Sequence, residues 1–402
     1  MSIFCPRVIN GNRGDLASRL GILAALEQLG IRDIDVSCRH DTDIASLRLR
    51  TLRHGPLVNL VPPPSGLHVL RTARSVIWTG GLDLQDDSSL VKLVHTLIVF
   101  SLYRLLRLKI YVLMQGAGPL DSRLGRLLTR HILNRVHTFV VRDSDSFRLL
   151  RSLNSRCRLI PGYDGIFVGD LRPEDASPEE LQAIDRVCRR RTGGPLIGFN
   201  LRLWFHFTSD WIPYQFSRNR YLRRSTEKMA QLQAAAVRYL RLLRREIDAE
   251  ILLISMYEPG VQPWEDDLGY LRRLKTEFPD DPAIRVVDIP LRMPAFTQFL
   301  SRLDLMVGMR LHSALVALRQ GVPAINLNYT LKGRGILRDL GLGDCVIDVE
   351  QFMARPESAL ELTCRILDDP AARQRVHEAV GAAVRRNGEV LRQLAEQFPR
   401  KA

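Results

Sequence analysis

An arginine and a histidine stand two residues apart where a short apolar run gives way to a helical pattern. Arg310 and His312 lie between residues 305–308, which predict a strand, and residues 313–320, which predict a helix. A guanidinium group holds phosphate or carboxylate, and an imidazole can transfer a proton near neutral pH. The pair therefore indicates a site that binds an anion and protonates a neighbouring group. The alternative is a histidine that only forms a hydrogen bond at the start of a helix.

Other charged residues and glycines also follow predicted strands. A parallel sheet binds ligands beyond the carboxyl ends of its strands, so residues at these positions are candidates for substrate binding. Glycine lets a ligand approach the backbone, and a helix N-terminus offers free N–H groups to an anion. A tight turn or a helix cap is the alternative for each glycine loop. The candidates are Gly14 and Asp15 after residues 2–9, Gly80 and Gly81 after 75–79, Gly116 and Gly118 after 109–115, Arg142 at the end of 138–142, Arg202 after 196–201 and Lys332 after 322–327.

Acidic residues follow two further turns. Asp86 belongs to a loop with Asp83 and Asp87 after residues 75–79. A carboxylate in this loop can act as a general base or orient a sugar hydroxyl, and a solvated loop with a helix cap is the alternative. Asp164 follows a Pro-Gly-Tyr turn and is predicted to stabilise that turn.

Both halves of the chain alternate strand and helix patterns, which is typical of α/β proteins with parallel sheets. Residues 1–175 predict an N-terminal Rossmann-like domain, and residues 196–380 predict a C-terminal one. Between them, residues 176–195 predict a linker helix and loop with Ser177 as the helix cap. Residues 381–402 predict a C-terminal helix. We expect two parallel sheets that face each other across a cleft.

The composition is that of a globular protein with a large positive charge. The chain has 402 residues, of which 46% are hydrophobic and 25% charged, and its net charge is +14. Only six of the 58 basic residues are lysines. Either an anionic partner or a biased genome accounts for this excess of arginine. Because no recognisable nucleic-acid-binding module accompanies the charge, a nucleic-acid partner is not expected.

The cysteines and the most apolar segment bear on location. The six cysteines are scattered without the spacing of a zinc site, so neither a metal nor a disulfide framework is expected. The first residues predict a strand and not a secretion signal, which favours a cytoplasmic location. Residues 90–114 contain five Lys, Arg and His residues, too many for a spanning helix. They predict a buried helix at 88–107, with peripheral contact at the inner face of the cell membrane as an alternative role.

Taken in order, these segments resemble the polysaccharide pyruvyl transferase family over residues 7 to about 342. The most specific part is Arg310-Leu311-His312 followed by Gly321-Val322-Pro323, Tyr329 and Lys332. The weaker matches are Asn12-Arg13-Gly14-Asp15, the segment from Gly80 to Asp86, Gln115-Gly116-Ala117-Gly118-Pro119, Arg142-Asp143 with Ser146, the Asp164 loop and Arg202. The chain departs from the pattern in two places. Two glycines stand at Gly80-Gly81 where three are common, and residues 204–224, rich in aromatic residues and arginines, match no part of it.

The resemblance implies a GT-B-like fold with phosphoenolpyruvate bound in the cleft. It implies that Arg202, Arg310 and His312 bind and activate this donor, with His312 as the proton donor. It places Asp86 near the acceptor sugar, where the carboxylate would act as a base.

The reaction implied by the resemblance moves a pyruvyl group from phosphoenolpyruvate to a sugar of a surface or exopolysaccharide precursor. It forms a pyruvate ketal, releases phosphate and uses phosphoenolpyruvate as a substrate without a further cofactor or metal. The expected acceptor is a glycan or a lipid-linked oligosaccharide. The alternative on the same scaffold is a GT-B glycosyltransferase that uses a nucleotide sugar.

Overall fold

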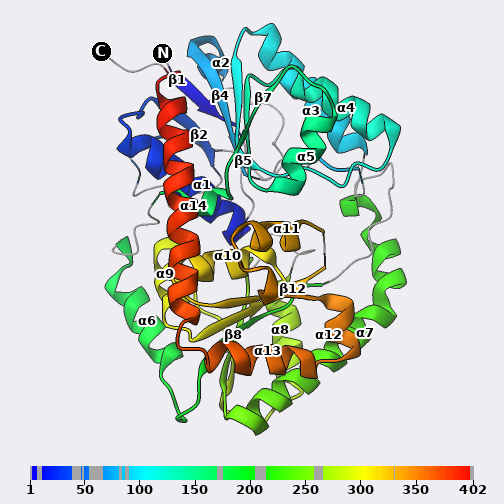
Figure 1. Ribbon diagram of the computed structural model, residues 1–402. Coiled ribbons are helices and arrows are strands. Elements are labelled where there is room, and N and C mark those ends of the chain that lie inside the picture. The colour runs from blue at the N-terminus through cyan, green and yellow to red at the C-terminus, as the bar shows by residue number, and fades with distance from the viewer. Residues whose placement is uncertain are drawn as a thin grey trace.

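Two parallel sheets, one in each half of the chain, organise the fold (Figure 1). The computed structural model describes residues 2–6, 11–38, 47, 49–53, 67–80, 84–86, 90–169, 175–203, 214–257, 266–329 and 331–398. For residues 53, 67–68, 214–224 and 331–332 it describes the backbone alone.

The N-terminal sheet has seven parallel strands in the order β3-β2-β1-β4-β5-β6-β7. The strands are β1 (Ser2–Cys5), β2 (Ile34–Cys38), β3 (Arg50–Arg53), β4 (Ala73–Thr79), β5 (Lys109–Gln115), β6 (Thr138–Val141) and β7 (Arg158–Pro161). On β5, Ile110 and Val112 pack with α3 (Leu90–Leu105) and α4 (Arg123–Leu133), whereas Tyr111 and Leu113 pack with α1 (Arg13–Gln28) and η3 (Gly165–Phe167). Helices therefore cover both faces, which explains why the central strands are apolar at nearly every position.

The C-terminal sheet has six parallel strands in the order β10-β9-β8-β11-β12-β13. The strands are β8 (Leu196–Asn200), β9 (Glu250–Ile254), β10 (Ile284–Val287), β11 (Leu305–Gly308), β12 (Ala324–Asn328) and β13 (Val346–Asp348). One face packs against α7 (Tyr214–Ile247), α8 (Asp267–Lys275), α12 (Val349–Ala354) and α13 (Glu357–Leu367). The other packs against α9 (Met293–Ser301) and α10 (Leu311–Arg319). The remaining helices are α2 (Leu67–Thr72), α5 (Ser144–Ser152), α6 (Pro178–Cys188), α11 (Leu331–Asp339), η6 (Gly343–Cys345) and α14 (Ala372–Ala395).

One hydrophobic core runs through both halves. Its residues come from α1 and η3 on the N-terminal side and from α9 and α10 on the C-terminal side. The long helix α14 belongs to the same core and runs along both halves in Figure 1, where it is drawn in red. The division expected between residues 380 and 381 falls inside this helix, so the end of the chain returns to the N-terminal half as part of a continuous element.

The expected α/β class with two parallel sheets is confirmed, and several elements lie where the pattern predicted them. The strands at 109–115 and 305–308 have the predicted bounds. The linker helix α6 has the predicted cap, because the Ser177 hydroxyl accepts the Glu180 N–H and the Glu180 carboxylate accepts the Ser177 N–H. Helix α7 begins at Tyr214, within the segment 204–224 that departs from the family pattern.

Asn387 fastens α14 to the loop that contains Asp164. Its side-chain NH₂ donates to the carbonyls of Asp164 and Phe167 at 3.1 and 3.0 Å, and its oxygen accepts the Tyr163 N–H at 2.8 Å. The side chain is fully buried. A buried amide that satisfies three backbone groups sets the position of this loop.

Replacing Asn387 with alanine removes the side-chain partner of the Tyr163 N–H and of the Phe167 carbonyl, whereas the Asp164 carbonyl keeps the Phe167 N–H at 3.0 Å. We expect Asn387→Ala to lower the free energy of unfolding by about 2 kcal/mol, because each buried group that loses its partner costs on the order of 1 kcal/mol or more. Urea titration measures this loss. Glu389→Ala, on the exposed side of α14, is the control and should change stability by less than about 0.5 kcal/mol. Equal effects of the two substitutions would contradict the anchoring role of Asn387.

Candidate functional site

Both sheets reverse their strand order at one place, and the candidate residues gather there. In the N-terminal sheet β1 lies beside β4, and in the C-terminal sheet β8 lies beside β11. At such a point the connections leave in opposite directions and open a crevice at the carboxyl ends of the strands. The loops of Gly14 and Gly80 follow β1 and β4, and the loops of Arg202 and Arg310 follow β8 and β11.

Asn200 ties the two arginine loops together. It lies beside Gly308 in the register of β8 and β11. Its carbonyl accepts the Met309 N–H at 2.9 Å, and its Oδ1 accepts the Arg310 N–H at 3.1 Å. The side chain is fully buried, so these bonds are shielded from water. Arg202 and Arg310 therefore leave the sheet next to each other from a fixed backbone.

A buried carboxylate and an aromatic ring hold the guanidinium group of Arg310. Its Nε and Nη2 donate to the two oxygens of Asp267 at 2.5 and 2.7 Å. Its central carbon lies 4.3 Å from the centre of the Tyr257 ring. Asp267 begins α8, which follows β9, so Arg310 leans from β11 across β8. The two-pronged pair fixes the direction of the guanidinium group and offsets part of its charge.

Arg202 leans in the opposite direction, from β8 across β11 toward the end of β12. Its Nη1 donates to the hydroxyl of Tyr329 at 2.7 Å, and its central carbon lies 5.1 Å from the centre of that ring. Its Nε donates to the carbonyl of Leu203 at 3.2 Å. Because a phenol carries no charge, Tyr329 orients the guanidinium group without offsetting its charge.

His312 lies in the first turn of α10 and faces the N-terminal half. Its Nε2 lies 3.7 Å from Oδ2 of Asp164. The same carboxylate oxygen accepts Nη1 of Arg142 at 3.1 Å, and the other oxygen accepts the Ile166 N–H at 3.1 Å. Asp164 is 1% exposed. An ion network of His312, Asp164 and Arg142 therefore joins the two halves.

The pKa of Asp164 reflects this network. Burial alone would raise the pKa, but the hydrogen bond and charge of His312, the charge of Arg142 and the Ile166 N–H outweigh burial and lower the pKa to about 2. The carboxylate therefore stays ionised at neutral pH. It therefore presents a negative charge to the His312 ring and can hold the orientation of the imidazole.

Gly14 allows the N-terminal half to approach His312 closely. A β-carbon on Gly14 would lie 2.2 Å from the β-carbon of His312, so a larger side chain does not fit there. Asn12 caps α1 by accepting the Gly14 N–H at 3.0 Å, and its NH₂ donates to the carboxylate of Asp15 at 2.9 Å. The Arg13 N–H donates to the carbonyl of Met256 at 3.0 Å. The first loop of the chain is thus a joint between the halves.

Gly116 lies against Arg142, and two more candidate glycines have backbone conformations that favour glycine. A β-carbon on Gly116 would lie 2.7 Å from Nε of Arg142, so a larger residue at this position would displace the arginine side chain. Gly118 has a φ of +93° and precedes a cis peptide bond to Pro119. Gly80 ends β4 with a φ of +80°, a backbone conformation that favours glycine. Gly81 lies outside the described residues, as does the side chain of Lys332.

The carboxylate of Asp86 is engaged at the start of α4. Its Oδ1 accepts the Asp121 N–H at 3.0 Å, and its Oδ2 accepts the Ser122 N–H at 2.7 Å and the Ser122 hydroxyl at 2.6 Å. Ser122 in turn caps α4 by accepting the Gly125 N–H at 2.9 Å. The side chain is buried. Here Asp86 holds the loop between β5 and α4.

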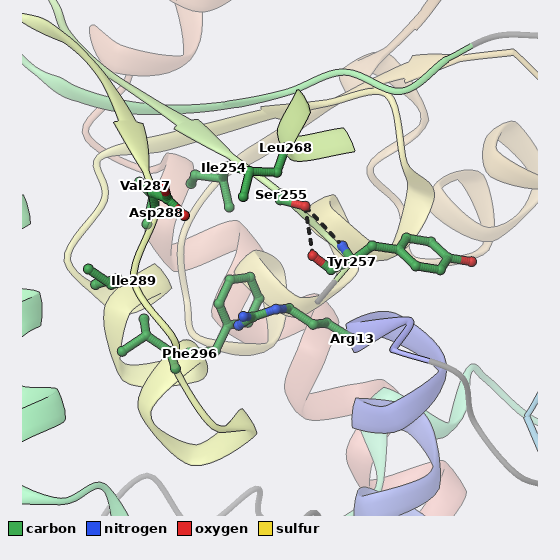
Figure 2. A pocket seen from close by; sticks show the side chains of 10 residues that line it. Arg13, Ile254, Ser255, Tyr257, Leu268, Val287, Asp288, Ile289 and Phe296 are labelled. Carbon is green, nitrogen blue, oxygen red and sulfur yellow. Dashed lines mark hydrogen bonds between the residues drawn. The ribbon is translucent and has the colours of Figure 1, made fainter. Parts of the chain in front are cut away.

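A small cavity lies under the joint between the halves (Figure 2). Arg13, Tyr257 and Phe296 are among its lining residues, and Arg13 lies over the Phe296 ring at 4.4 Å. Its volume of about 20 Å³ admits about one water molecule and no sugar. Tyr257, whose ring lies against Arg310, is thus also one of the residues that border this cavity.

Together these residues place cationic groups and an imidazole beside the crevice where the halves meet. Arg202 and Arg310 belong to the C-terminal sheet, whereas Arg142 comes from the N-terminal sheet. Such a set suits a ligand with two anionic groups and a reaction that needs one proton. Across the described residues, no three His, Cys, Asp or Glu side chains come together in a way that could hold a metal ion.

Comparison with known proteins identifies the family. The profile described as polysaccharide pyruvyl transferase matches residues 12–330. The chain belongs to the polysaccharide pyruvyl transferase family. It is 23% identical over 387 residues to the amylovoran biosynthesis protein AmsJ of Erwinia amylovora, with 85% of this chain and 86% of AmsJ covered.

Solved structures with the same fold share little sequence with this pyruvyl transferase family member. HepE (Alr3699) from Anabaena, in complex with UDP and glucose, has a TM-score of 0.57 at 14% identity over 99% of both chains. UDP-GlcNAc 2-epimerase from Neisseria meningitidis, bound to UDP-GlcNAc, has a TM-score of 0.59 at 10% identity over 99% of this chain and all of its own. These similarities confirm the GT-B-like fold. They support no conclusion beyond the fold.

The structure brings some of the predicted residues together and adds others. His312, Gly14 and Arg142 meet around Asp164, for which the sequence predicted only a turn-stabilising role. Asp86 lies at the start of α4 instead. Asp267 and Asn387 were not predicted as parts of the site. An acidic residue in the first turn of a helix, as Asp267 is in α8, is a weak signal, and Asn387 has no such signal.

The ion network predicts how Asp164 contributes to stability as the pH changes. Its pKa in the folded protein, about 2, lies below its ordinary value of 3.8. The ionised carboxylate therefore stabilises the fold fully above about pH 4, and this contribution is lost as the pH falls toward 2. At pH 6, we expect the free energy of unfolding of Asp164→Asn to be about 2 kcal/mol lower than that of the wild type. About half of this difference should be gone at pH 3.

Urea titrations of the wild type and Asp164→Asn at pH 6, 4 and 3 measure the difference. Asp185→Asn, at a 69% exposed side chain, is the control and should match the wild type at each pH. A difference for Asp164→Asn that stays constant down to pH 3 would show that the charge of Asp164 does not contribute in this way.

Proposed function

We propose that this protein transfers a pyruvyl group from phosphoenolpyruvate to a sugar of an exopolysaccharide precursor and forms a pyruvate ketal. The observation that carries the proposal is His312, held beside ionised Asp164 at the edge of the sheet from which Arg202 and Arg310 project. Membership of the family supports the type of transfer, and a relative named for amylovoran biosynthesis supports a polysaccharide acceptor.

Phosphoenolpyruvate carries a phosphate and a carboxylate, which two guanidinium groups can bind separately. Arg202, whose contact with Tyr329 leaves its charge in place, binds one of the two anionic groups. Arg310 binds the other from a position fixed by Asp267. Both arginines follow adjacent strands, β8 and β11, at the edge where the crevice opens.

His312 protonates the methylene carbon of the donor. The double bond then becomes a methyl group beside a cationic carbon, to which a sugar hydroxyl adds as its proton passes to the imidazole that has just given one up. Phosphate leaves with the electron pair of the C–O bond and takes up the proton of a second hydroxyl, whose oxygen closes the ketal. One donor and one diol give one ketal and one phosphate, so the reaction as proposed needs neither an oxidant nor a further cofactor.

The remaining parts of the site have supporting roles in this proposal. Asp164 orients the imidazole, and the charge of Arg142 helps to keep Asp164 ionised. Asp86 positions the loop between β5 and α4 on the acceptor side. Its bonds to Asp121 and Ser122 favour this role over that of a free base. The proposal places the reaction in the cytoplasm, where phosphoenolpyruvate is available, with a glycan or lipid-linked oligosaccharide as acceptor.

Incubation of the protein with phosphoenolpyruvate and a panel of glycosides tests the reaction. Phosphate release that depends on the acceptor, together with a glycoside mass increased by one pyruvate ketal, supports the proposal. Release of UDP from a UDP-sugar without consumption of phosphoenolpyruvate would instead make the protein a glycosyltransferase on the same fold.

Removing the imidazole tests the proton donor. We expect His312→Gln to fold normally and to lower kcat by about 10²- to 10⁴-fold, because a positioned general acid contributes on this scale. Phosphate release under saturating phosphoenolpyruvate measures this loss. His377→Gln, at an exposed histidine of α14, is the control. Unchanged turnover of His312→Gln would remove His312 from the mechanism.

Removing one hydroxyl tests the role of Arg202 in binding the donor. Tyr329→Phe deletes the group that accepts Nη1 of Arg202, so the guanidinium group is less well oriented before the donor arrives. We expect KM for phosphoenolpyruvate to rise about tenfold with little change in kcat, since a hydrogen bond to a charged group is worth on the order of 1.5 kcal/mol.

Tyr270→Phe is the matched control, because the Tyr270 hydroxyl has no hydrogen-bond partner among the described residues. A fall in kcat for Tyr329→Phe without a rise in KM would contradict the binding role of Arg202.

A further inference from the structure

An apolar stripe runs along the outer side of α3. Its members, spaced by three or four residues and therefore on one face of the helix, are Val91, Val94, Ile98, Leu102 and Leu105. Between 39% and 79% of each side chain is exposed. The opposite side of α3 is anchored in the core, where Phe100 packs against Trp78 and Tyr103 against Phe4. The stripe is therefore an outward surface of a firmly held helix.

Helix α4 extends this surface. Helices α3 and α4 are successive crossover connections of the N-terminal sheet and pack side by side on the same face of it, as Figure 1 shows. Leu124 and Leu127 of α4 are 41% and 50% exposed, and Leu106 follows the end of α3 at 42%. Over the described part of the chain, every large hydrophobic side chain that is exposed belongs to α3, α4 or Leu106. We refer to these eight residues as the apolar surface.

Positive charge borders the apolar surface. Between residues 88 and 142 the sequence has nine Lys and Arg residues and a single acid, Asp121. The exposed members include Arg104, Arg107, Lys109 and Arg123. A soluble monomer rarely leaves so many large apolar side chains together in water. The combination of aliphatic side chains with bordering cations matches the boundary between the acyl chains and the acidic head groups of a bilayer.

We propose that the apolar surface of α3 and α4 docks on a membrane that contains acidic phospholipids. The aliphatic side chains enter the head-group boundary, and the arginines contact lipid phosphates. No described helix is both long and apolar enough to cross a bilayer, so this contact is peripheral. A second copy of the chain is a less suitable occupant, because a two-fold contact would bring the arginines of both copies together. The proposal does not rest on the pyruvyl reaction, since its test measures binding alone.

Sedimentation with vesicles tests this proposal on the full chain. We expect binding to vesicles of phosphatidylglycerol and phosphatidylcholine in equal parts, weaker binding as salt is added, and little binding to pure phosphatidylcholine. Ile98→Ser with Leu105→Ser should weaken binding at least tenfold without changing net charge. Both sites are more than 60% exposed, so circular dichroism should show an unchanged fold.

Two pairs of charge reversals distinguish binding through the apolar surface from attraction by the overall positive charge. Arg104→Glu with Arg107→Glu should weaken binding at least tenfold, whereas Arg365→Glu with Arg385→Glu, at exposed sites of α13 and α14, should weaken it far less. Equal losses from the two pairs would overturn the proposal in favour of non-specific attraction. So would absence of vesicle binding, or a wild-type dimer that Ile98→Ser with Leu105→Ser turns into a monomer.

Discussion

A buried, ionised carboxylate needs hydrogen-bond donors and cations around it. For Asp164, the groups that meet this need come from both halves of the molecule. Ionised and 1% exposed, it needs Arg142 from the end of β6, the Ile166 N–H from its own turn and His312 from α10 of the other half. Because these groups come from different elements, the two sheets have one arrangement in which all of them reach the carboxylate.

Small residues and one amide make this arrangement sterically possible. Gly14 lets α1 approach His312, and Gly116 leaves room for the side chain of Arg142. Asn387 of α14 forms hydrogen bonds with the backbone on both sides of Asp164. These bonds connect the C-terminal helix to the site. A second joint, where Asp339 accepts the N–H and hydroxyl of Ser144 at 2.6 and 2.8 Å, restrains the far side of the crevice. The site is therefore a product of the interface between the halves.

Local pattern was sufficient to predict the sheets but not the partners across them. Buried parallel strands are short apolar runs with sharp ends, so β5 and β11 could be predicted to the residue. The predicted sheet edge also placed Arg202 near Arg310. Spacing carries no information about which side chains meet after folding: Asp267 pairs with Arg310 across 43 residues, and Asn387 reaches Asp164 across 223. Asp86 was predicted as a base because it lies in an acidic loop after a strand. The same pattern occurs when the carboxylate binds the backbone at the start of a helix, as Asp86 does at α4.

The position of α3 and α4 relates the apolar surface to the crevice. In a parallel sheet each crossover helix starts near the carboxyl end of the strand before it, which is the edge where the crevice opens. Helix α3 follows β4 and α4 follows β5, so both helices begin near the Gly80 and Gly118 loops and run away from the crevice along the outside of the sheet. Asp86 ties these beginnings together, since its backbone N–H donates to the carbonyl of Pro119 and its carboxylate holds Ser122. In the proposed membrane contact, a lipid surface at the beginnings of α3 and α4 would thus lie beside the crevice, which suits the lipid-linked acceptor of the proposed reaction.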